Sequence, residues 1–158
     1  MELDQELFEF WGLLFEIVAD LEKRLAAHMV AHQLTPPQFY VLKTLMEYGG
    51  RCRIGRIAEE HHLTNATMTG LIKRLEAMNP PLVSRETSTE DARSVNVLIT
   101  AEGEQRYWAV YSSLMQQTQA FLALFPREER LEALQKLRIY FRVLVEHFPL
   151  PTDPQPQP

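Results

Sequence analysis

A polar and basic face is expected on one helix in the middle of the chain, within the run LTNATMTGLIKRLEAMN, residues 63–79. The opposite face is an apolar stripe at helical spacing, made of Leu63, Ala66, Met68, Leu71, Ile72 and Leu75. The polar face has short hydrogen-bonding side chains at the start and cations further along: Thr64, Asn65, Thr67, Thr69, Lys73 and Arg74. A helix that enters a DNA major groove by its N-terminal end needs this arrangement.

A short basic hairpin is expected directly after this helix. The run LVSRETSTEDARSVNVLIT, residues 82–100, has two segments rich in β-forming residues around a polar turn. Arg85, Asp91 and Arg93 lie at or near its tip. A helix followed by such a hairpin makes a winged helix, so the expected partner is double-stranded DNA.

Roles for the side chains of the helix follow from their chemistry. Thr64 is suited to be the N-cap, which accepts a hydrogen bond from a backbone N–H at the helix start. Asn65, Thr67 and Thr69 are expected to reach base edges or phosphates. The cations Lys73 and Arg74 are expected to contact phosphate.

The hairpin supplies a second set of expected contacts. Arg93 is the candidate for the minor groove, where a narrow A·T stretch deepens the negative potential. Asp91 is expected to hold that arginine in place, because a carboxylate is repelled by phosphates. Arg85 is a candidate for the DNA backbone. The alternative for Lys73, Arg74 and Arg85 is that they only solvate the surface or pair with Glu76 and Glu86.

The segment from Ile57 to Gly103 resembles the MarR family of transcriptional regulators. The resemblance is carried, in order, by Ile57-Ala58, Thr64, Leu71, Arg74-Leu75-Glu76, Leu82-Val83, Arg85, Asp91-x-Arg93 and Ile99-Thr100-x-x-Gly103. The chain departs from the family pattern at three places. Asn79-Pro80-Pro81 stands where the family has a single glycine, and Ala92 stands where an arginine is frequent. Arg53 stands where a serine or threonine usually caps a helix. The resemblance implies a repressor that binds a pseudo-palindromic operator as a dimer and is released by a small ligand.

Long helices are expected on both sides of the winged helix. Apolar or bulky residues follow a heptad rhythm through Leu7, Trp11, Leu14, Val18, Leu21, Leu25, His28 and His32. Further helices are expected from Thr35 to about Tyr48, after the N-cap Thr100, and from about Pro126. Because so small a monomer cannot bury the first helix, we expect it to pair with a second chain. The alternative is an intramolecular bundle.

The fold class expected is therefore mostly α with a small β-hairpin wing, a winged helix-turn-helix embedded in a helical dimerisation body. Residues 1–148 are expected to form one domain. Within it, 1–33 and 101–148 make the dimerisation body and 34–100 the DNA-binding module. Residues 149–158, rich in proline, are expected to be a disordered tail.

Charge and composition fit an intracellular regulator. The net charge is −5, but residues 51–93 hold seven Lys/Arg and six Asp/Glu, a net of +1. The acidity lies mostly in residues 1–50, so the expected DNA contact face is weakly basic. No apolar run is long enough for a secretory signal or a membrane span, and the single cysteine, Cys52, fits a reducing cytoplasm. We therefore expect a cytoplasmic protein without membrane contact.

The resemblance also implies an effector pocket between the dimer body and the winged helix. Its candidate lining residues are Trp11, Phe15, His28, His32, Phe39, Tyr40, Trp108 and Tyr111. Such a lining suits a small aromatic acid or phenol, although each of these residues also suits a plain hydrophobic core.

Other functions are alternatives or are disfavoured. The helical spacing of His28 and His32 would suit a metal, but no third ligand is evident, so we expect no metal site, with a metal-responsive regulator as the alternative. Cys52 is expected to be a small buried hydrophobe, with a redox switch as the alternative. No catalytic motif and no cofactor motif is found, so we expect no enzyme. A winged helix used only for protein–protein contact is the competing interpretation.

Overall fold

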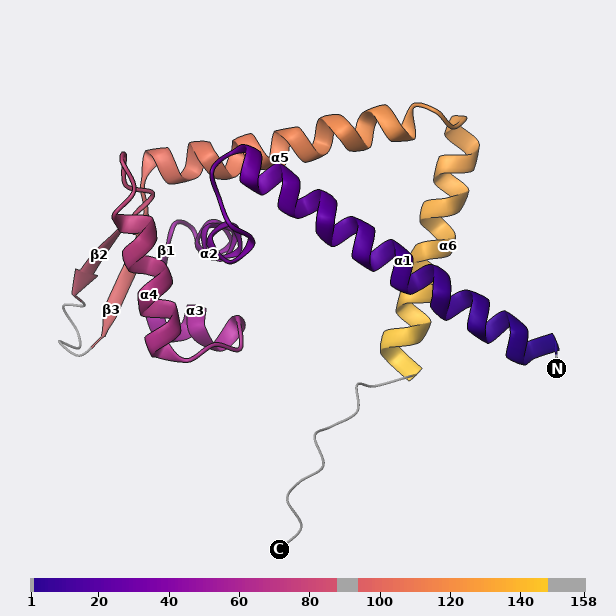
Figure 1. Ribbon diagram of the computed structural model, residues 1–158, viewed down its shortest axis with the longest axis horizontal. Coiled ribbons are helices and arrows are strands. Elements are labelled where there is room, and N and C mark those ends of the chain that lie inside the picture. Colours follow the sequence, from indigo (N-terminus) through magenta and orange to yellow (C-terminus); the bar gives the residue numbers. More distant parts are fainter. Residues whose placement is uncertain (1, 88–93, 148–158) are drawn as a thin grey trace, which may run out of the picture. The chain divides into compact units, whose positions relative to one another are not determined.

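The computed structural model describes residues 2–87 and 94–147, and it is mostly helical with one small antiparallel sheet (Figure 1). This confirms the fold class predicted from the sequence. In chain order the elements are α1 (Glu2–Ala31), α2 (Pro36–Glu47), β1 (Arg51–Arg53), α3 (Ile54–Glu60), α4 (Asn65–Glu76), β2 (Val83–Thr87), β3 (Val95–Ile99), α5 (Ala101–Leu122) and α6 (Arg127–His147). We call residues 36–99, from α2 to β3, the winged-helix module.

The ends of α2 follow the predicted capping signals. The side chain of Gln38 accepts a hydrogen bond of 2.9 Å from the backbone N–H of Thr35, and proline occupies the first helical position. After the helix, Gly49 and Gly50 have φ angles of 70° and 89°, which glycine adopts without strain. The chain can therefore reverse sharply and enter β1.

The sheet has three strands in the order β1-β3-β2, with both pairs antiparallel. Cys52 and Arg85 lie opposite Val97 from the two sides of β3. The sequence predicted only the hairpin of β2 and β3, and β1 was missed. A strand of three residues is too short to show an alternating pattern, and its pairing with β3 spans over forty residues of sequence.

The hydrophobic core lies in the winged-helix module and reaches into the helices that flank it. Its buried residues are Met29, Leu34, Phe39, Val41, Leu42, Leu45, Cys52, Ile57, Ala58, Met68, Leu71, Ile72, Leu75, Leu82, Val83, Val97 and Val110. Met29 belongs to the C-terminal end of α1 and Val110 to the first half of α5. Both helices are thus anchored in the core next to the module.

Away from this core, α1 exposes apolar side chains. Val18 and Leu21 of the predicted heptad positions are 50% and 53% exposed, whereas Leu14 is half-buried. Phe8 and Phe15, which lie outside the heptad positions, are 81% and 68% exposed. The heptad prediction therefore described a narrower apolar surface than the helix has.

The chain divides into two compact units, residues 1–115 and 116–158. In the second unit the last turns of α5 and the helix α6 line an apolar groove of about 390 Å³. No residue of α6 is buried, although the helix carries Leu134, Leu137 and Phe141. No helix in the described part of the chain is both long and apolar enough to cross a membrane.

Candidate DNA-binding surface

Helix α4 supplies the polar face that the sequence predicted, and it starts at the predicted cap. The Thr64 hydroxyl accepts a hydrogen bond of 3.1 Å from the backbone N–H of Thr67, which confirms Thr64 as the N-cap. Met68, Leu71, Ile72 and Leu75 are buried. The helix is shorter than predicted and ends at Glu76. The first two residues of the expected apolar stripe are exposed, because Leu63 precedes the helix and Ala66 lies in its open first turn.

The hydroxyl groups of α4 are partly engaged within the helix. Those of Thr64 and Thr67 are 2.9 Å apart, and both residues are exposed. The Thr69 hydroxyl donates to the carbonyl oxygen of Asn65 at 2.7 Å, which leaves the oxygen of Thr69 able to accept. The side chain of Asn65 is exposed at the helix start. These polar groups thus gather at the N-terminal end of α4.

Two cations extend this surface toward the C-terminal end of the helix. Lys73 and Arg74 are both exposed, and the Nε of Arg74 donates to the carbonyl oxygen of Gly70 at 3.2 Å. Neither makes an ion pair among the described residues. Both therefore keep a positive charge available to an external anion.

Arg85, on β2, is placed differently. Its guanidinium forms an ion pair with the Glu76 carboxylate at the end of α4, with N–O distances of 2.7 and 2.8 Å. From the sequence, Arg85 was expected to contact the DNA backbone, with an ion pair to Glu76 as the alternative. The structure has the ion pair. Arg85 therefore fastens the wing to α4, and its charge is largely balanced.

The tip of the wing lies outside the described residues. Arg93, the predicted minor-groove contact, and Asp91, which is predicted to hold it in place, both fall outside the described residues. The described arms of the hairpin are β2 and β3, whose last pair joins Thr87 to Val95.

A groove of about 460 Å³ separates the start of α4 from the base of the wing. It is lined by Arg53, Ile54, Gly55, Arg56, Glu59, Asn65, Ser94 and Val95. Except for Asn65, none of these residues was a predicted DNA contact. The signal that could have found it was Arg53 itself, which stood out only as a departure from the family's capping pattern.

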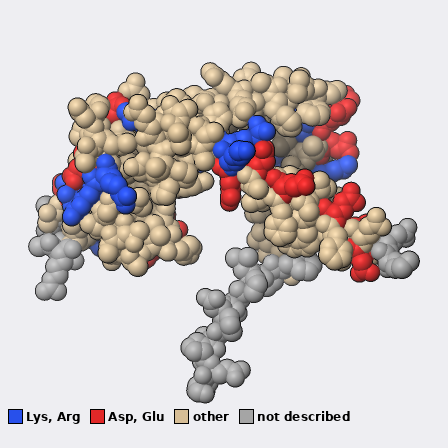
Figure 2. Space-filling view, viewed as in Figure 1, with Lys and Arg blue, Asp and Glu red and all other residues tan. Residues whose placement is uncertain are grey.

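The basic side chains on the winged-helix module are visible as a cluster on the face drawn in Figure 2. Several of them are balanced by nearby carboxylates. Arg51 pairs with Glu86 at 3.2 Å, and Arg56 pairs with Glu60 at 3.2 Å. Arg53 makes no ion pair within the described residues.

A hydrogen-bonded junction joins the start of the wing to the start of α5. The backbone N–H of Thr100 donates to the carbonyl oxygen of Leu82 at 3.0 Å, and the Thr100 hydroxyl donates to that of Pro81 at 2.7 Å. The same hydroxyl accepts from the N–H of Gly103 at 3.1 Å, which confirms Thr100 as the N-cap of α5. A Cβ atom at Gly103 would lie 2.1 Å from the Leu82 oxygen, so only glycine allows this approach.

The predicted effector-pocket residues fall into separate groups. Phe39 is buried and stacks on Tyr107, with ring centroids 5.5 Å apart, and Tyr107 in turn contacts Trp108 and Tyr111. Tyr40 contacts Phe39 at 5.7 Å. Sequence reasoning missed Tyr107, the ring that joins α2 to α5.

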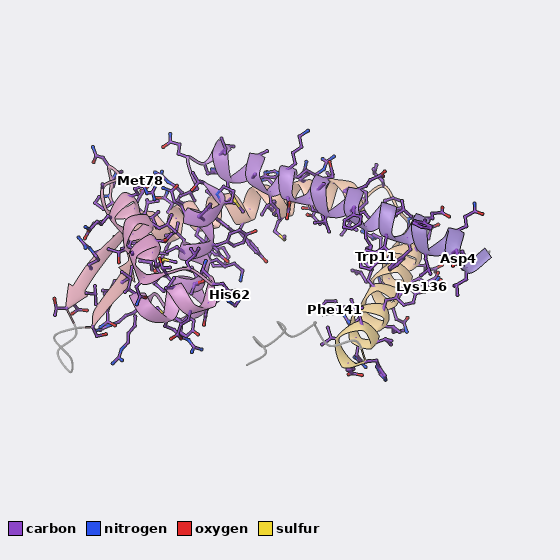
Figure 3. All side chains as sticks on the ribbon, turned by 60° about the horizontal axis from the view of Figure 1, so that its bottom comes forward. Asp4, Trp11, His62, Met78, Lys136 and Phe141 are labelled. Atoms are coloured by element: carbon purple, nitrogen blue, oxygen red, sulfur yellow. The ribbon has the colours of Figure 1, made fainter. Side chains whose placement is uncertain are left out.

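Trp11 and Phe15 belong to a different part of α1. Their rings contact each other at 5.7 Å. Figure 3 shows Trp11 far along α1 from the winged-helix module, which contains His62 and Met78. The structure therefore does not bring these two residues together with the aromatic group around Tyr107.

Two of the histidines, His28 and His61, form hydrogen bonds with hydroxyl groups. His28 lies 2.7 Å from the Ser113 hydroxyl and so ties α1 to α5, whereas His32 is half-buried. His61 lies 2.8 Å from the hydroxyl of the buried Thr44, and burial lowers the pKa of His61 below its ordinary value. Among the described residues, no group of three or more His, Cys, Asp or Glu side chains is arranged to hold a metal ion.

Cys52 is buried, as the sequence predicted. Burial, and then the negative charge of Glu60, raises the pKa of its thiol above the ordinary value. A raised pKa reduces the thiolate fraction at neutral pH, so this cysteine is poorly suited to a redox reaction.

Comparisons with known proteins show similarity to one family. Residues 34–95 match the model of the MarR family. The HTH-type transcriptional repressor MdtR of Bacillus subtilis is 25% identical over 130 residues, which cover 82% of each chain. A MarR family protein from Bacillus stearothermophilus has a TM-score of 0.76 at 25% identity, covering 90% of this chain and 98% of that one.

A mutant of S. aureus MepR bound to an oligodeoxyribonucleotide shares the fold, with a TM-score of 0.66 at 20% identity, covering 85% of this chain and 97% of that one. The matched segment includes α2 to α4, β2 and the start of β3, the elements that build the polar surface described above. The winged-helix module of this chain is therefore similar to that of the MarR family of transcriptional regulators.

Proposed function

We propose that this protein is a repressor that binds a pseudo-palindromic DNA operator as a homodimer. The observation that carries the proposal is the surface of α4. Met68, Leu71, Ile72 and Leu75 are buried. The outer face of the helix offers Asn65, Thr67 and Lys73 to an external partner. Residues at the N-terminal end of such a helix read base edges in the major groove, and cations further along contact phosphate. The repressor activity named for MdtR supports the direction of regulation.

The wing supplies the second part of the proposed contact. Arg93 enters the adjacent minor groove, and Asp91 orients it. Arg85 stays paired with Glu76 and sets the angle between wing and helix. Replacing Arg93 by Ala should weaken operator binding and relax the preference for A·T-rich flanks. Replacing Lys73 by Ala should weaken all sequences alike.

The experiment that tests this function is a selection of bound fragments from genomic DNA, followed by titration at two salt concentrations. A specific regulator enriches a few fragments that share a two-fold symmetric sequence. A winged helix that serves only protein–protein contact enriches none. The partial balancing of its cations by Glu76, Glu86 and Glu60 is the observation that favours that second candidate.

The exposed apolar surface of α1 supports the dimer. A row of half-exposed apolar side chains in water favours association, and a second copy of the chain offers the same surface. Replacing Val18 and Leu21 by Glu should give monomers, because both side chains are half-exposed in the single chain and their replacement leaves its core intact. Replacing the adjacent, exposed Lys23 by Glu is the control, which changes charge without removing apolar surface. Native protein that sediments as a monomer at micromolar concentration would rule out this architecture.

A small aromatic or phenolic effector is the proposed releasing signal. The rings of Tyr40, Trp108 and Tyr111 are each 40% to 49% exposed around the Phe39–Tyr107 stack. A ligand need bind the released state only about a hundredfold better to supply about 2.7 kcal/mol of negative coupling. A thermal-shift screen of phenols and aromatic acids, followed by DNA release, tests this step. A response to peroxide or zinc alone would assign the signal to Cys52 or to the histidines instead.

A further inference from the structure

We propose that the groove between the start of α4 and the base of the wing is a binding site for a phosphate of the DNA backbone, with Arg53 as its cationic ligand. This inference rests on the proposed DNA binding and adds a contact to it. The groove has Arg53 on one wall, Asn65 at the first position of α4, and Ser94 next to β3. A DNA backbone passing from the helix in the major groove to the wing in the minor groove crosses this position.

Among the arginines of β1 and α3, the charge balance singles out Arg53. Arg51 on the same strand is paired with Glu86, and Arg56 is held by Glu60 and by Glu59 at 3.8 Å. Arg53 is exposed and makes no ion pair among the described residues. A guanidinium that has no acidic partner in the described part of the chain is the group on this wall best suited to a phosphate oxygen.

The other walls supply hydrogen-bond donors and one opposing charge. The amide of Asn65 and the hydroxyl of Ser94 can both donate to a phosphate oxygen. The Glu59 carboxylate also lines the groove. Its negative charge should weaken the binding of a phosphate. Arg53 and Glu59 are therefore expected to have opposite effects on DNA affinity.

The position of Arg53 depends on the third strand of the sheet. Pairing of β1 with β3 places Arg53 opposite Asn96, two residues from Ser94. The β1 strand alternates in burial, with Cys52 inside and both arginines outside. Arg51 and Arg53 thus share a strand and an exposed face, but only Arg53 lines the groove.

Arg53→Gln is the test, and Arg51→Gln is its matched control. Each removes one positive charge from the same strand, so their long-range electrostatic effects are similar. The slope of log K against log salt is negative, and each lost phosphate contact reduces its magnitude by about 0.9. For a dimer on two half-sites the reduction is about 1.8. We expect Arg53→Gln to show this change and to weaken binding about tenfold at 0.1 M salt. Arg51→Gln should change the slope by less than half as much.

Two further measurements keep the outcome decisive. Glu59→Gln should tighten DNA binding, and ethylation of one backbone phosphate per half-site should block the wild-type protein but not Arg53→Gln. Thermal unfolding of each variant shows whether the fold is intact. If the wild-type protein binds DNA and Arg53→Gln and Arg51→Gln weaken that binding equally, the phosphate site alone would be overturned. Absence of DNA binding by the wild-type protein would overturn the proposed function itself.

Discussion

Replacing Gly103 by Ala tests the junction between the wing and α5. The added Cβ would lie 2.1 Å from the Leu82 carbonyl oxygen and 2.8 Å from a side-chain carbon of Ile99. The carbonyl cannot turn away freely, because it accepts the 3.0 Å hydrogen bond from the N–H of Thr100. The start of α5 must therefore shift relative to the wing.

The size of the effect follows from two opposing contributions. Forcing a methyl group into a packed site costs about 1–3 kcal/mol, and a clash with backbone lies at the upper end of that range. Alanine gains about 1 kcal/mol over glycine in a helix. We expect Gly103→Ala to lower the free energy of unfolding by about 2 kcal/mol, which lowers Tm by about 4–8 °C in a domain of this size.

Gly12→Ala is the matched control for this variant. Gly12 also lies in a helix, α1, but a Cβ there would have no atom within 4 Å. The control should therefore be neutral or stabilising, by up to about 1 kcal/mol. Differential scanning calorimetry of the two variants separates the clash from helix propensity. A Gly103→Ala protein that unfolds at or above the wild-type temperature would refute the described contact between α5 and Leu82.

Two other predictions concern single hydrogen bonds in the module. Thr64→Ala should destabilise the protein by about 1 kcal/mol, because the Thr67 N–H loses its acceptor, and chemical denaturation measures the loss. His61 has a pKa lowered by burial, so the folded state binds its proton less readily than the unfolded state does. Its contribution to stability is present above about pH 6.5 and is lost as the pH falls below that value. The fall in Tm between pH 7.5 and 5.5 should be smaller in His61→Gln than in the wild type. The control is His62→Asn, at an exposed neighbour, in which this fall in Tm should equal that of the wild type. An equal fall in all three proteins would contradict the assignment to His61.

Local signals predicted the helices and their caps well. Thr35, Thr64 and Thr100 were recognisable as helix starts because their side chains act within three or four residues of sequence. The strand β1 and the ring of Tyr107 were missed for the opposite reason. Their partners, β3 and Phe39, are distant in sequence, and nothing in the residues themselves specifies that pairing.

The candidate site shows the same division. The polar face of α4 could be predicted because a helix places residues of one spacing on one side. The pairing of Arg85 with Glu76 could only be weighed as an alternative, because it depends on how β2 packs against α4. The groove around Arg53 was not predicted. It is formed where α3, α4 and β3 meet, and Arg53 was its only signal in the sequence.

Sequence discrimination on DNA is the property that tests the central claim most directly. Fluorescence anisotropy would compare the affinity of the full chain for its selected sequence and for a scrambled duplex of equal length and composition, both at 0.15 M salt. The arrangement of Asn65 and Thr67 at the start of α4 predicts a preference of at least about a thousandfold. Equal affinity for the two duplexes, or binding to neither, would contradict it.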